Sequence, residues 1–467
     1  LYYIIMLPNN LKYQPKVESA PARRYRTNIQ PQNGTGPYTN GNTIIFNIPT
    51  RNNTALIPSE STMKFSTSFT ITGANASVCA LESCGAHAYI NRLRVFHGSN
   101  LLQDIQEYHQ LAKILYDYQM PLDATQGKYS VTSGTTNEYT GVVPSATAAN
   151  QVANGIIVKP VNRGKSYVAQ ADSATPNLAS GSVVTDSFSI NLISLVGSLA
   201  GGKYLPLWEM TSAPLRVEIV LQSSLVNAVA LGPNTVSTTN FSLSNVEFIG
   251  EFLELPDSAI AAVKAGSSNP LQMVIPDWRA YTYSTSLSAG SATTVSMPIP
   301  AKFSSLKSIL VNSRENTGAV TYYPVSSNKL SLNSYQFRIG SEVLPSTAPT
   351  TDADFYNEAL KCFSSLADLD AQPSIDVDAF TQNRAVVMDT FIENVTSNSG
   401  SFLVGIDCEA YQNADKSSIF AGMNTNTSDI FYQPTHAAIA AITVYYTAFA
   451  NFDSVLVCEN GVAYTRF

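Results

Sequence analysis

Hydrophobic and polar residues alternate along many short stretches of the chain, and this period of two predicts β-strands. The clearest case is the segment 61–72, in which Met63, Phe65 and Phe69 would share one face. Pro, Asn and Gly residues flank most of these stretches, as expected for turns at strand ends. Strands are predicted over 42–49, 61–72, 90–98, 186–194, 213–222, 241–255, 277–287, 293–300, 304–316, 334–345, 401–412 and 440–467.

Other segments carry apolar residues at steps of three and four, which predicts amphipathic helices. In the segment 100–120, Ser99 or Asn100 is placed to cap the first turn, and Pro121 would end the helix. The stretch from Ile90 onward is therefore predicted as a strand, a tight "HGSN" turn and a helix. Further helices are predicted over 257–266 and 351–369.

The order of these elements suggests two domains after an N-terminal arm. Residues 1–41 are rich in Pro, Asn and Gly around a small basic group, Arg23, Arg24 and Arg26, and are predicted to be extended. The first domain would span 42–256 and include a long exposed Ser/Thr/Ala/Asn/Gly-rich loop at about 123–184, and the second would span 257–467. The elements recur in similar order, with "SSLKSILVNSREN" in the place of "INRLRVFHGSN", which indicates a duplicated all-β sandwich.

Composition agrees with a folded β protein of low charge. Charged residues make up 13% of the 467 positions, hydrophobic residues 44%, and the net charge is −7. This balance argues against a chain that coats nucleic acid with its whole surface. The five cysteines are scattered and odd in number, which favours reduced, buried thiols. The apolar start "LYYIIML" is too short to cross a bilayer, and no later run has the length of a transmembrane helix.

Candidate catalytic and metal-binding residues have structural interpretations. His87, His97 and His109 lack the i, i+4 spacing of a helical metal pair, and His436 stands alone. No nucleophile-elbow, phosphate-loop or dinucleotide motif is found, and "LAGGKYLPL" is interpreted as a turn. The acidic residues of 351–360 are interpreted as helix capping, and those of "SIDVDAF" (374–380) as a strand edge. We therefore expect no catalytic residues, no cofactor and no metal.

Several longer segments resemble a known family. They are "INRLRVFHGSNLLQDIQEYHQLAKILYDYQ", "SFSINLIS", "GGKYLPLWEMTSAPLRVEIVLQ", "FSLSNVEFIGEFLEL", "SFLVGIDCEAYQ" and "FANFDSVLVCENGVAYTRF". In order and texture the chain resembles the major capsid proteins of double jelly-roll DNA viruses, a group that includes adenovirus- and tectivirus-like viruses. The texture is closest to virophage, polinton-like or marine phage capsid proteins.

This resemblance implies two tandem jelly rolls per chain, with short helices in the loops and an extended N-terminal arm. It implies a homotrimer that forms a pseudo-hexameric capsomer in an icosahedral virion, assembled inside the host cell. Its partners would be neighbouring capsomers, penton proteins and minor capsid proteins. Arg23, Arg24 and Arg26 of the arm would face an inner membrane or the genome, without specific nucleic-acid readout. The alternatives are a β-sandwich carbohydrate-binding or adhesin module, and a glycoside hydrolase or lyase with two convergent carboxylates.

Overall fold

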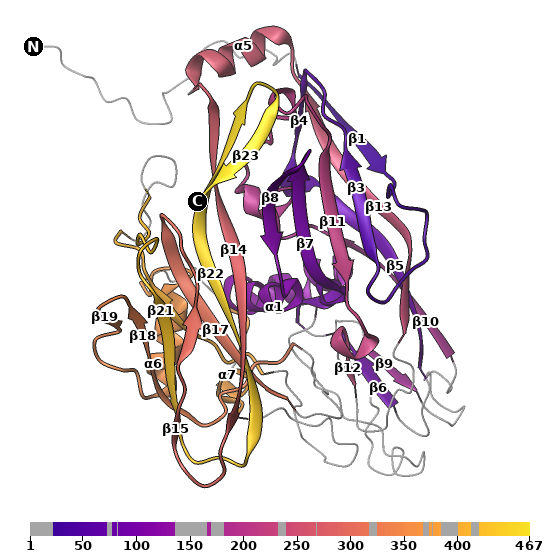
Figure 1. Cartoon of the computed structure of the whole chain (residues 1–467). Helices are drawn as coiled ribbons and strands as arrows, with labels where there is room; N and C mark the ends of the chain where they lie inside the picture. Colours follow the sequence, from indigo (N-terminus) through magenta and orange to yellow (C-terminus); the bar gives the residue numbers. More distant parts are fainter. Residues whose placement is uncertain are drawn as a thin grey trace, which may run out of the picture.

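The alternating segments assemble into two β-sandwiches that stand side by side (Figure 1). The computed structural model describes residues 22–71, 77–81, 83–135, 166–169, 182–231, 240–267, 269–316, 325–367, 373–375, 377–383, 400–411 and 420–467. Within these ranges, no hydrogen-bonded strand ladder joins the strands before residue 255 to those after residue 270. Each half of the chain therefore builds its own sandwich.

The first sandwich contains two main antiparallel sheets and one small sheet. One main sheet has the order β1 (Arg23–Ile29), β13 (Phe241–Glu254), β5 (Thr62–Ile71), β10 (Ser182–Ile190), with β2 (Tyr38–Thr39) and β4 (Thr54–Leu56) also paired to β13. The other has the order β3 (Thr43–Ile48), β11 (Leu215–Leu221), β7 (Ile90–His97), β8 (Asn100–Ile105). The small sheet is β12 (Ala230–Leu231), β6 (Ser77–Ala80), β9 (Ser166–Ala169).

The second sandwich repeats this plan. Its first sheet has the order β14 (Leu271–Leu287), β22 (Ile442–Glu459), β17 (Leu306–Asn316), β20 (Val404–Asp407), with β23 (Val462–Arg466) also paired to β22. Its second sheet has the order β15 (Thr293–Thr294), β21 (Ile430–His436), β18 (Leu332–Ile339), β19 (Glu342–Leu344), with β16 (Met297–Ile299) also paired to β21.

Both sandwiches follow one jelly-roll path. If the eight main strands of each half are counted along the chain, and β15 and β16 are counted as one, the sheets have the orders 1-8-3-6 and 2-7-4-5 in both halves. This pairing matches β17 with β5, and β18 with β7. The equivalence expected between "SSLKSILVNSREN" and "INRLRVFHGSN" is therefore wrong, because the counterpart of β7 is the strand in "SYQFRIG". Gly98 lies in the turn between β7 and β8, and Gly340 lies in the equivalent turn between β18 and β19, with φ of 60° and 61°.

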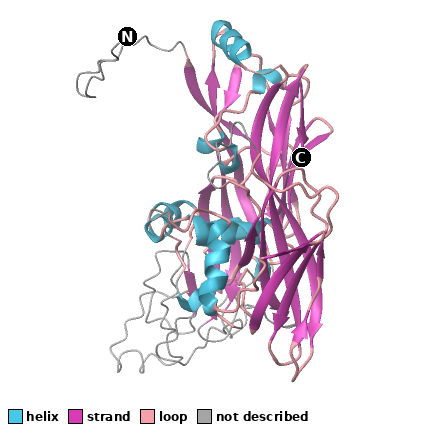
Figure 2. Cartoon of the chain, turned by 90° about the vertical axis from the view of Figure 1, so that its left-hand side faces the viewer, coloured by secondary structure: helices cyan, strands magenta, loops and turns pink. Residues whose placement is uncertain are grey.

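Helices lie in the connections and beside the sheets (Figure 2). They are α1 (Tyr108–Gln119), α2 (Leu122–Gln126), α3 (Lys128–Thr132), α5 (Asp257–Gly266), α6 (Asp352–Lys361) and α7 (Val377–Thr381). Short 3-10 helices are η2 (Pro58–Glu60), η3 (Gly85–Tyr89), η4 (Ser198–Ala200), η5 (Leu207–Glu209) and η6 (Leu225–Asn227). The helix predicted over 257–266 is confirmed as α5, which connects the two sandwiches at one end of the molecule (Figure 1).

Two helix and strand predictions need correction. The start of the helix predicted over 100–120 is β8, because the positive φ of Gly98 closes a tight hairpin and returns the chain alongside β7. Helix α1 begins only at Tyr108, after Glu107 in a left-handed conformation, and neither Ser99 nor Asn100 caps it. Part of "SIDVDAF" forms α7 and not a strand edge.

The segments expected as an arm and a long loop also contain regular structure. Within 22–41, residues Arg23–Ile29 form β1, which pairs with β13 along its whole length, and Tyr25 stacks on Phe252 at 5.5 Å. Residues 1–21 lie outside the described residues. Within 123–184, helices α2 and α3 and strand β9 are described, and 136–165 and 170–181 lie outside the described residues.

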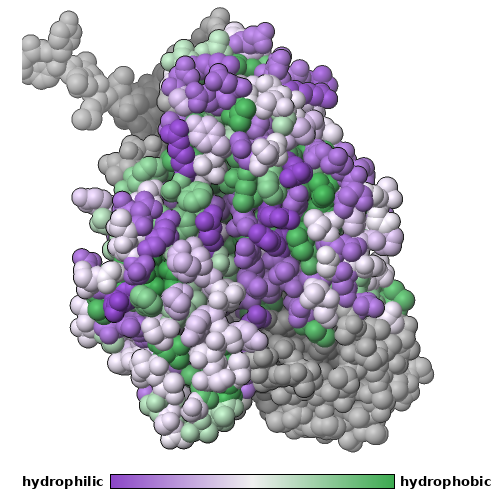
Figure 3. Space-filling model, in the orientation of Figure 1, coloured by the Kyte–Doolittle hydropathy of each residue, from purple (hydrophilic) through white to green (hydrophobic). Residues whose placement is uncertain are grey.

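Each sandwich has an aromatic and aliphatic core. Phe46, Phe65 and Phe248 are fully buried in the first sandwich, and Phe337, Tyr432 and Tyr446 are fully buried in the second. On the face seen in Figure 3, hydrophobic residues are scattered among polar ones along both sandwiches. Within the described residues, no helix combines the length and hydropathy that crossing a bilayer requires.

Candidate functional site

All four histidines are buried, and hydrogen bonds account for three of them. His87 lies between two tyrosine hydroxyls, with Nδ1 and Nε2 each 2.9 Å from the hydroxyl oxygens of Tyr108 and Tyr116. Burial lowers the pKa of His87 to about 3, so its ring is neutral at physiological pH. His436 binds the Leu330 carbonyl and the Tyr446 hydroxyl. These contacts support the structural interpretation of His87 and His436.

His109 differs, because its ring has weaker polar contacts. Its Nε2 lies 3.8 Å from Glu107 Oε2, and its Nδ1 has no hydrogen-bond partner among the residues that the structure describes. Burial, and to a lesser extent the charge of Arg314, lowers the pKa of His109 to about 3. Within the described ranges, no three His, Cys, Asp or Glu side chains are arranged to share a metal ion.

The acidic residues predicted to cap the helix at 351–360 lie in its first turn, and one of them also forms an ion pair. Thr351 caps α6 by accepting a hydrogen bond from the backbone nitrogen of Asp354, and Asp352 and Asp354 lie in the first turn. Asp352 also pairs with Lys329 at 2.6 Å. These contacts agree with the predicted capping role of the first cluster.

The two sandwiches lie side by side (Figure 1). Hydrogen bonds from residues of the stretch 90–119 join them along a polar seam. At one end, His97 accepts a hydrogen bond from the backbone nitrogen of Ala463 at 3.0 Å, and its Nε2 donates to the Met210 carbonyl at 3.1 Å. Asn100 donates to the Ala463 carbonyl at 3.0 Å. The hairpin β7–β8 is thereby bound to β23 of the other sandwich.

A buried ion pair on α1 forms the middle of the seam. Lys113 Nζ lies 2.7 Å from Asp117 Oδ2 and 3.1 Å from Ser401 Oγ of the second sandwich. Ser401 Oγ donates to the same carboxylate oxygen at 2.8 Å, and Tyr118 donates to the Ser401 carbonyl. Lys113 and Asp117 are only 3% and 2% exposed. Buried charges are tolerated when they are paired and hydrogen-bonded, so this group fixes the relative position of the sandwiches.

A second buried carboxylate, Asp277 on β14, lies near β8. Its Oδ1 accepts hydrogen bonds from Gln103 Nε2 of the first sandwich and from the backbone nitrogen of Trp278, both at 2.8 Å. Gln103 also accepts from the backbone nitrogen of Leu195. Burial raises the pKa of Asp277 to about 6, although both hydrogen bonds and the charge of Arg279 oppose the shift. The sequence analysis did not identify Asp277, because its burial depends on residues of the other half.

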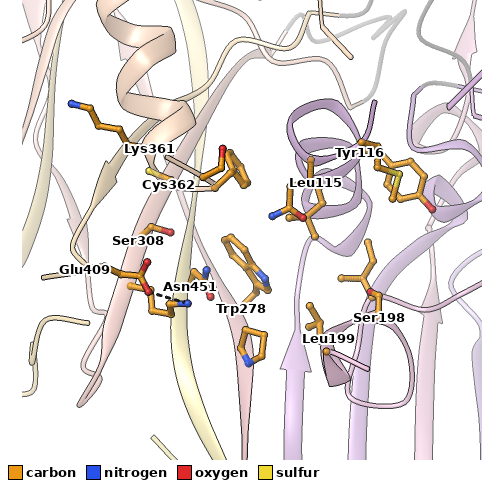
Figure 4. Close-up of a pocket in the computed structure, with 18 of the residues that line it drawn as sticks. Leu115, Tyr116, Ser198, Leu199, Trp278, Ser308, Lys361, Cys362, Glu409 and Asn451 are labelled. Atoms are coloured by element: carbon orange, nitrogen blue, oxygen red, sulfur yellow. Dashed lines mark ion pairs between the residues drawn. The ribbon is translucent and has the colours of Figure 1, made fainter. Parts of the chain in front are cut away.

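A cavity of about 320 Å³ lies within the same seam (Figure 4). Leu115 and Tyr116 of α1 line one side, and Trp278, Ser308 and Glu409 lie across from them. Lys307 and Glu409, both in the lining, form an ion pair at 3.0 Å. Glu409 is the single carboxylate among the described residues of the lining, and it is ion-paired, so this described lining does not present the pair of free carboxylates that a glycosidase needs.

The three arginines of the predicted arm have different surroundings. Arg24 pairs with Glu60 and with Glu251 Oε2, the latter at 3.0 Å. Arg23 and Arg26 instead line an open depression of about 580 Å³ together with Arg51, a residue that the sequence analysis did not single out. The signal that could have identified Arg51 is its turn sequence "RNNT", but nothing local indicates that this turn lies next to β1.

Comparisons with known proteins identify the architecture. No protein-family model matches the chain, and no curated protein sequence matches it. Its structure is similar to that of PBCV-1 VP54 (TM-score 0.61, 9% identity, 98% of this chain and 99% of that chain). It is also similar to a protein in the structure of the Sputnik virophage (TM-score 0.61, 12% identity, 100% and 93% coverage). A third similar structure is the mavirus major capsid protein (TM-score 0.54, 12% identity, 100% and 95% coverage).

These likenesses span both sandwiches and confirm the predicted all-β fold of two tandem jelly rolls. Identities of 9–12% establish the fold alone. With two sheets of order 1-8-3-6 and 2-7-4-5 in each half, the chain has the double jelly-roll fold seen in the mavirus major capsid protein.

Proposed function

We propose that the chain is the major structural subunit of a viral capsid. The observation that carries this proposal is the extent of the fold likeness, which covers 100% of this chain and 95% of the mavirus major capsid protein. Fold alone does not fix function, because many folds host unrelated activities. However, the likeness includes both jelly rolls and their arrangement within one chain, which is the part of the architecture that an assembly subunit uses.

The seam between the sandwiches supports an assembly role. A subunit that tiles a shell needs its two jelly rolls held at a fixed relative position, and the Lys113–Asp117–Ser401 group and the Gln103–Asp277 hydrogen bond hold them. We further propose that three chains form a pseudo-hexameric capsomer of an icosahedral virion, with the jelly rolls joined at α5. In this proposal capsomers contact one another and penton and minor capsid proteins, and assembly takes place in the host cell.

The experiment is a measurement of the oligomeric state of the purified full-length chain. Light scattering coupled to size exclusion is expected to give about 151 kDa, three times the 50.3 kDa chain mass. Negative-stain images are expected to show particles with pseudo-hexagonal outline, and assembled shells at high protein concentration. A chain that stays monomeric at every concentration tested would count against the capsid role.

The carbohydrate-binding alternative is not favoured by any of these observations. Incubation with a glycan array provides the independent check. Specific binding by a chain that does not self-associate would favour the alternative over the capsid role.

A further inference from the structure

The cavity of about 320 Å³ between the two sandwiches, which we call the seam cavity, combines polar and aromatic side chains (Figure 4). Leu115 of α1 lines it on the side of the first sandwich, and Trp278, Ser308 and Asn451 line it on the side of the second. Its volume falls in the range of pockets that hold small molecules.

The three lining residues of the second sandwich form a row across its sheet. Trp278 on β14 lies directly opposite Asn451 on β22, and Asn451 lies opposite Ser308 on β17. Residues directly opposite each other in antiparallel strands point to the same face of the sheet. The register therefore places an aromatic ring, an amide and a hydroxyl group next to one another on the cavity wall.

Two polar atoms of this row lack a hydrogen-bond partner. Ser308 is only 2% exposed, and neither its hydroxyl oxygen nor the buried Oδ1 of Asn451 has a partner among the residues that the structure describes. A buried polar atom without a partner destabilises the protein. Both residues line the cavity, so a ligand inside it can supply the missing hydrogen bonds.

The charged side chains of the described lining are already paired. Lys307 and Glu409 form an ion pair with each other at 3.0 Å, and Lys361 pairs with Glu358 on α6. A charged ligand buried beside these pairs would lose its hydration without gaining a counter-ion. The described lining therefore favours a neutral ligand.

Trp278 provides a surface for a flat ring. Among the described residues it makes no ring contact with another aromatic side chain, whereas Phe363 of the same lining stacks on Tyr118 at 5.4 Å. Leu115 lies across from Trp278, so a planar ligand would have an aromatic side chain on one face and an aliphatic one on the other (Figure 4). A sugar fits less well, because each of its hydroxyl groups would need a partner.

Exposed residues give the seam cavity an opening. Gln119, Ser198 and Gly201 of the lining are exposed, and Ser364 and Ser365 are half-buried. The polar groups of these residues can bind water and need no partner inside the cavity. A small molecule can enter here from solvent without separation of the two sandwiches.

From these observations we infer that the seam cavity binds a neutral, planar heteroaromatic molecule that carries an amino group beside a ring nitrogen. The ring lies against Trp278, the amino group donates to Asn451 Oδ1, and the Ser308 hydroxyl donates to the ring nitrogen. Because residues of both sandwiches line the cavity, the bound molecule stabilises their relative position. The inference rests on the cavity itself and does not depend on the proposed capsid role.

The test is isothermal titration calorimetry of the full-length chain with 9-methyladenine and with 2-aminopyrimidine, each of which carries this pair of groups on a neutral ring. Both are expected to bind and to raise the thermal midpoint as their concentration rises. 6-Dimethylamino-9-methylpurine keeps the purine ring but has no amino hydrogen to donate to Asn451. It is expected to bind on the order of tenfold more weakly than 9-methyladenine.

Two serine variants separate the cavity from the rest of the sheet. Ser308→Ala is expected to weaken the binding of 9-methyladenine about tenfold and to fold as the wild type does, since no described residue hydrogen-bonds to this hydroxyl. The matched control is Ser454→Ala, which removes an equally buried hydroxyl without a described partner from β22, outside the described lining. It is expected to bind 9-methyladenine as the wild type does.

Fluorescence locates the bound molecule. The chain contains two tryptophans, Trp208 and Trp278, and stacking of 9-methyladenine on Trp278 is expected to quench the emission. The quenching should persist in Trp208→Phe, which leaves Trp278 as the single tryptophan. Trp278→Phe should abolish it.

Each of three outcomes would overturn the inference. The first is that neither 9-methyladenine nor 2-aminopyrimidine binds at millimolar concentration, which would mean that the cavity holds water only. The second is equal affinity for 9-methyladenine and its dimethylamino analogue. The third is that Ser308→Ala and Ser454→Ala have the same effect on binding, or that Trp208→Phe abolishes the quenching, because the ligand would then lie elsewhere.

Discussion

Asp277 offers a direct test of the seam, because its charge is buried where the two sandwiches meet. Burial raises its pKa from 3.8 to about 6, so the folded protein favours the neutral carboxyl group. Below pH 3.8 the carboxyl group is neutral in both the folded and the unfolded chain, and its burial carries no charge penalty. As the pH rises from 3.8 to about 6, ionisation lowers the stability of the folded state, and above that pH the loss stays constant. A shift of about two pKa units corresponds to roughly 3 kcal/mol at neutral pH.

The perturbation is Asp277→Asn, which keeps an oxygen for the hydrogen bonds from Gln103 and Trp278 but removes the charge. We expect the variant to be more stable than the wild type at pH 7 to 8, by up to roughly 3 kcal/mol, and to show little gain near pH 4. The difference in thermal midpoint between variant and wild type, followed from pH 4 to 8, measures this effect. Two neighbouring charges also act on Asp277: the charge of Arg279 lowers its pKa, and the charge of Asp104 raises it.

The control is Asp429→Asn. The hydrogen bond and charge of Lys302 lower the pKa of exposed Asp429, so its contribution is present at neutral pH and is lost as the pH falls. Its replacement should therefore produce a small loss of stability at neutral pH, opposite in sign. The reasoning on Asp277 is refuted if Asp277→Asn is destabilised at pH 7 to 8, or if its effect does not change between pH 4 and 7.

Three further predictions concern the fold and the seam. Lys113→Met is expected to cost about 3–5 kcal/mol because it leaves Asp117 charged and buried, and the double variant Lys113→Met, Asp117→Leu should recover much of that loss in a denaturation series. Removal of the chain through residue 29 deletes β1 and is expected to lower the thermal midpoint more than removal through residue 21; equal midpoints would contradict the role of β1. Gly85→Ala should lower the thermal midpoint, because φ of Gly85 is 55° and the added Cβ would overlap the Ser133 backbone. Gly266→Ala is the control, since its Cβ would meet open space, and its thermal midpoint should be unchanged or slightly higher.

The seam residues could not be recognised from local sequence. Lys113 and Asp117 lie four residues apart on α1, a spacing that usually indicates an exposed ion pair. Both are buried because Ser401, nearly 300 positions later, covers them. The burial of Asp277 likewise depends on Gln103. A local pattern reports which face of an element is apolar, but not which distant segment will lie against its polar side.

The sequence by itself determined the positions of most strands, the helix 257–266 and the all-β class, because side-chain alternation is a property of neighbouring residues. It did not determine β8, since the segment 101–105 carries apolar residues compatible with both periods and only pairing with β7 makes it a strand. The order 1-8-3-6 joins strands such as β1 and β13, which are more than 200 residues apart. That pairing brings Arg23 and Arg26 next to Arg51 and leaves Arg24 with Glu251. Contacts between remote segments are fixed by packing of the whole chain, and therefore only the tertiary structure decided which of these arginines is ion-paired within the described residues.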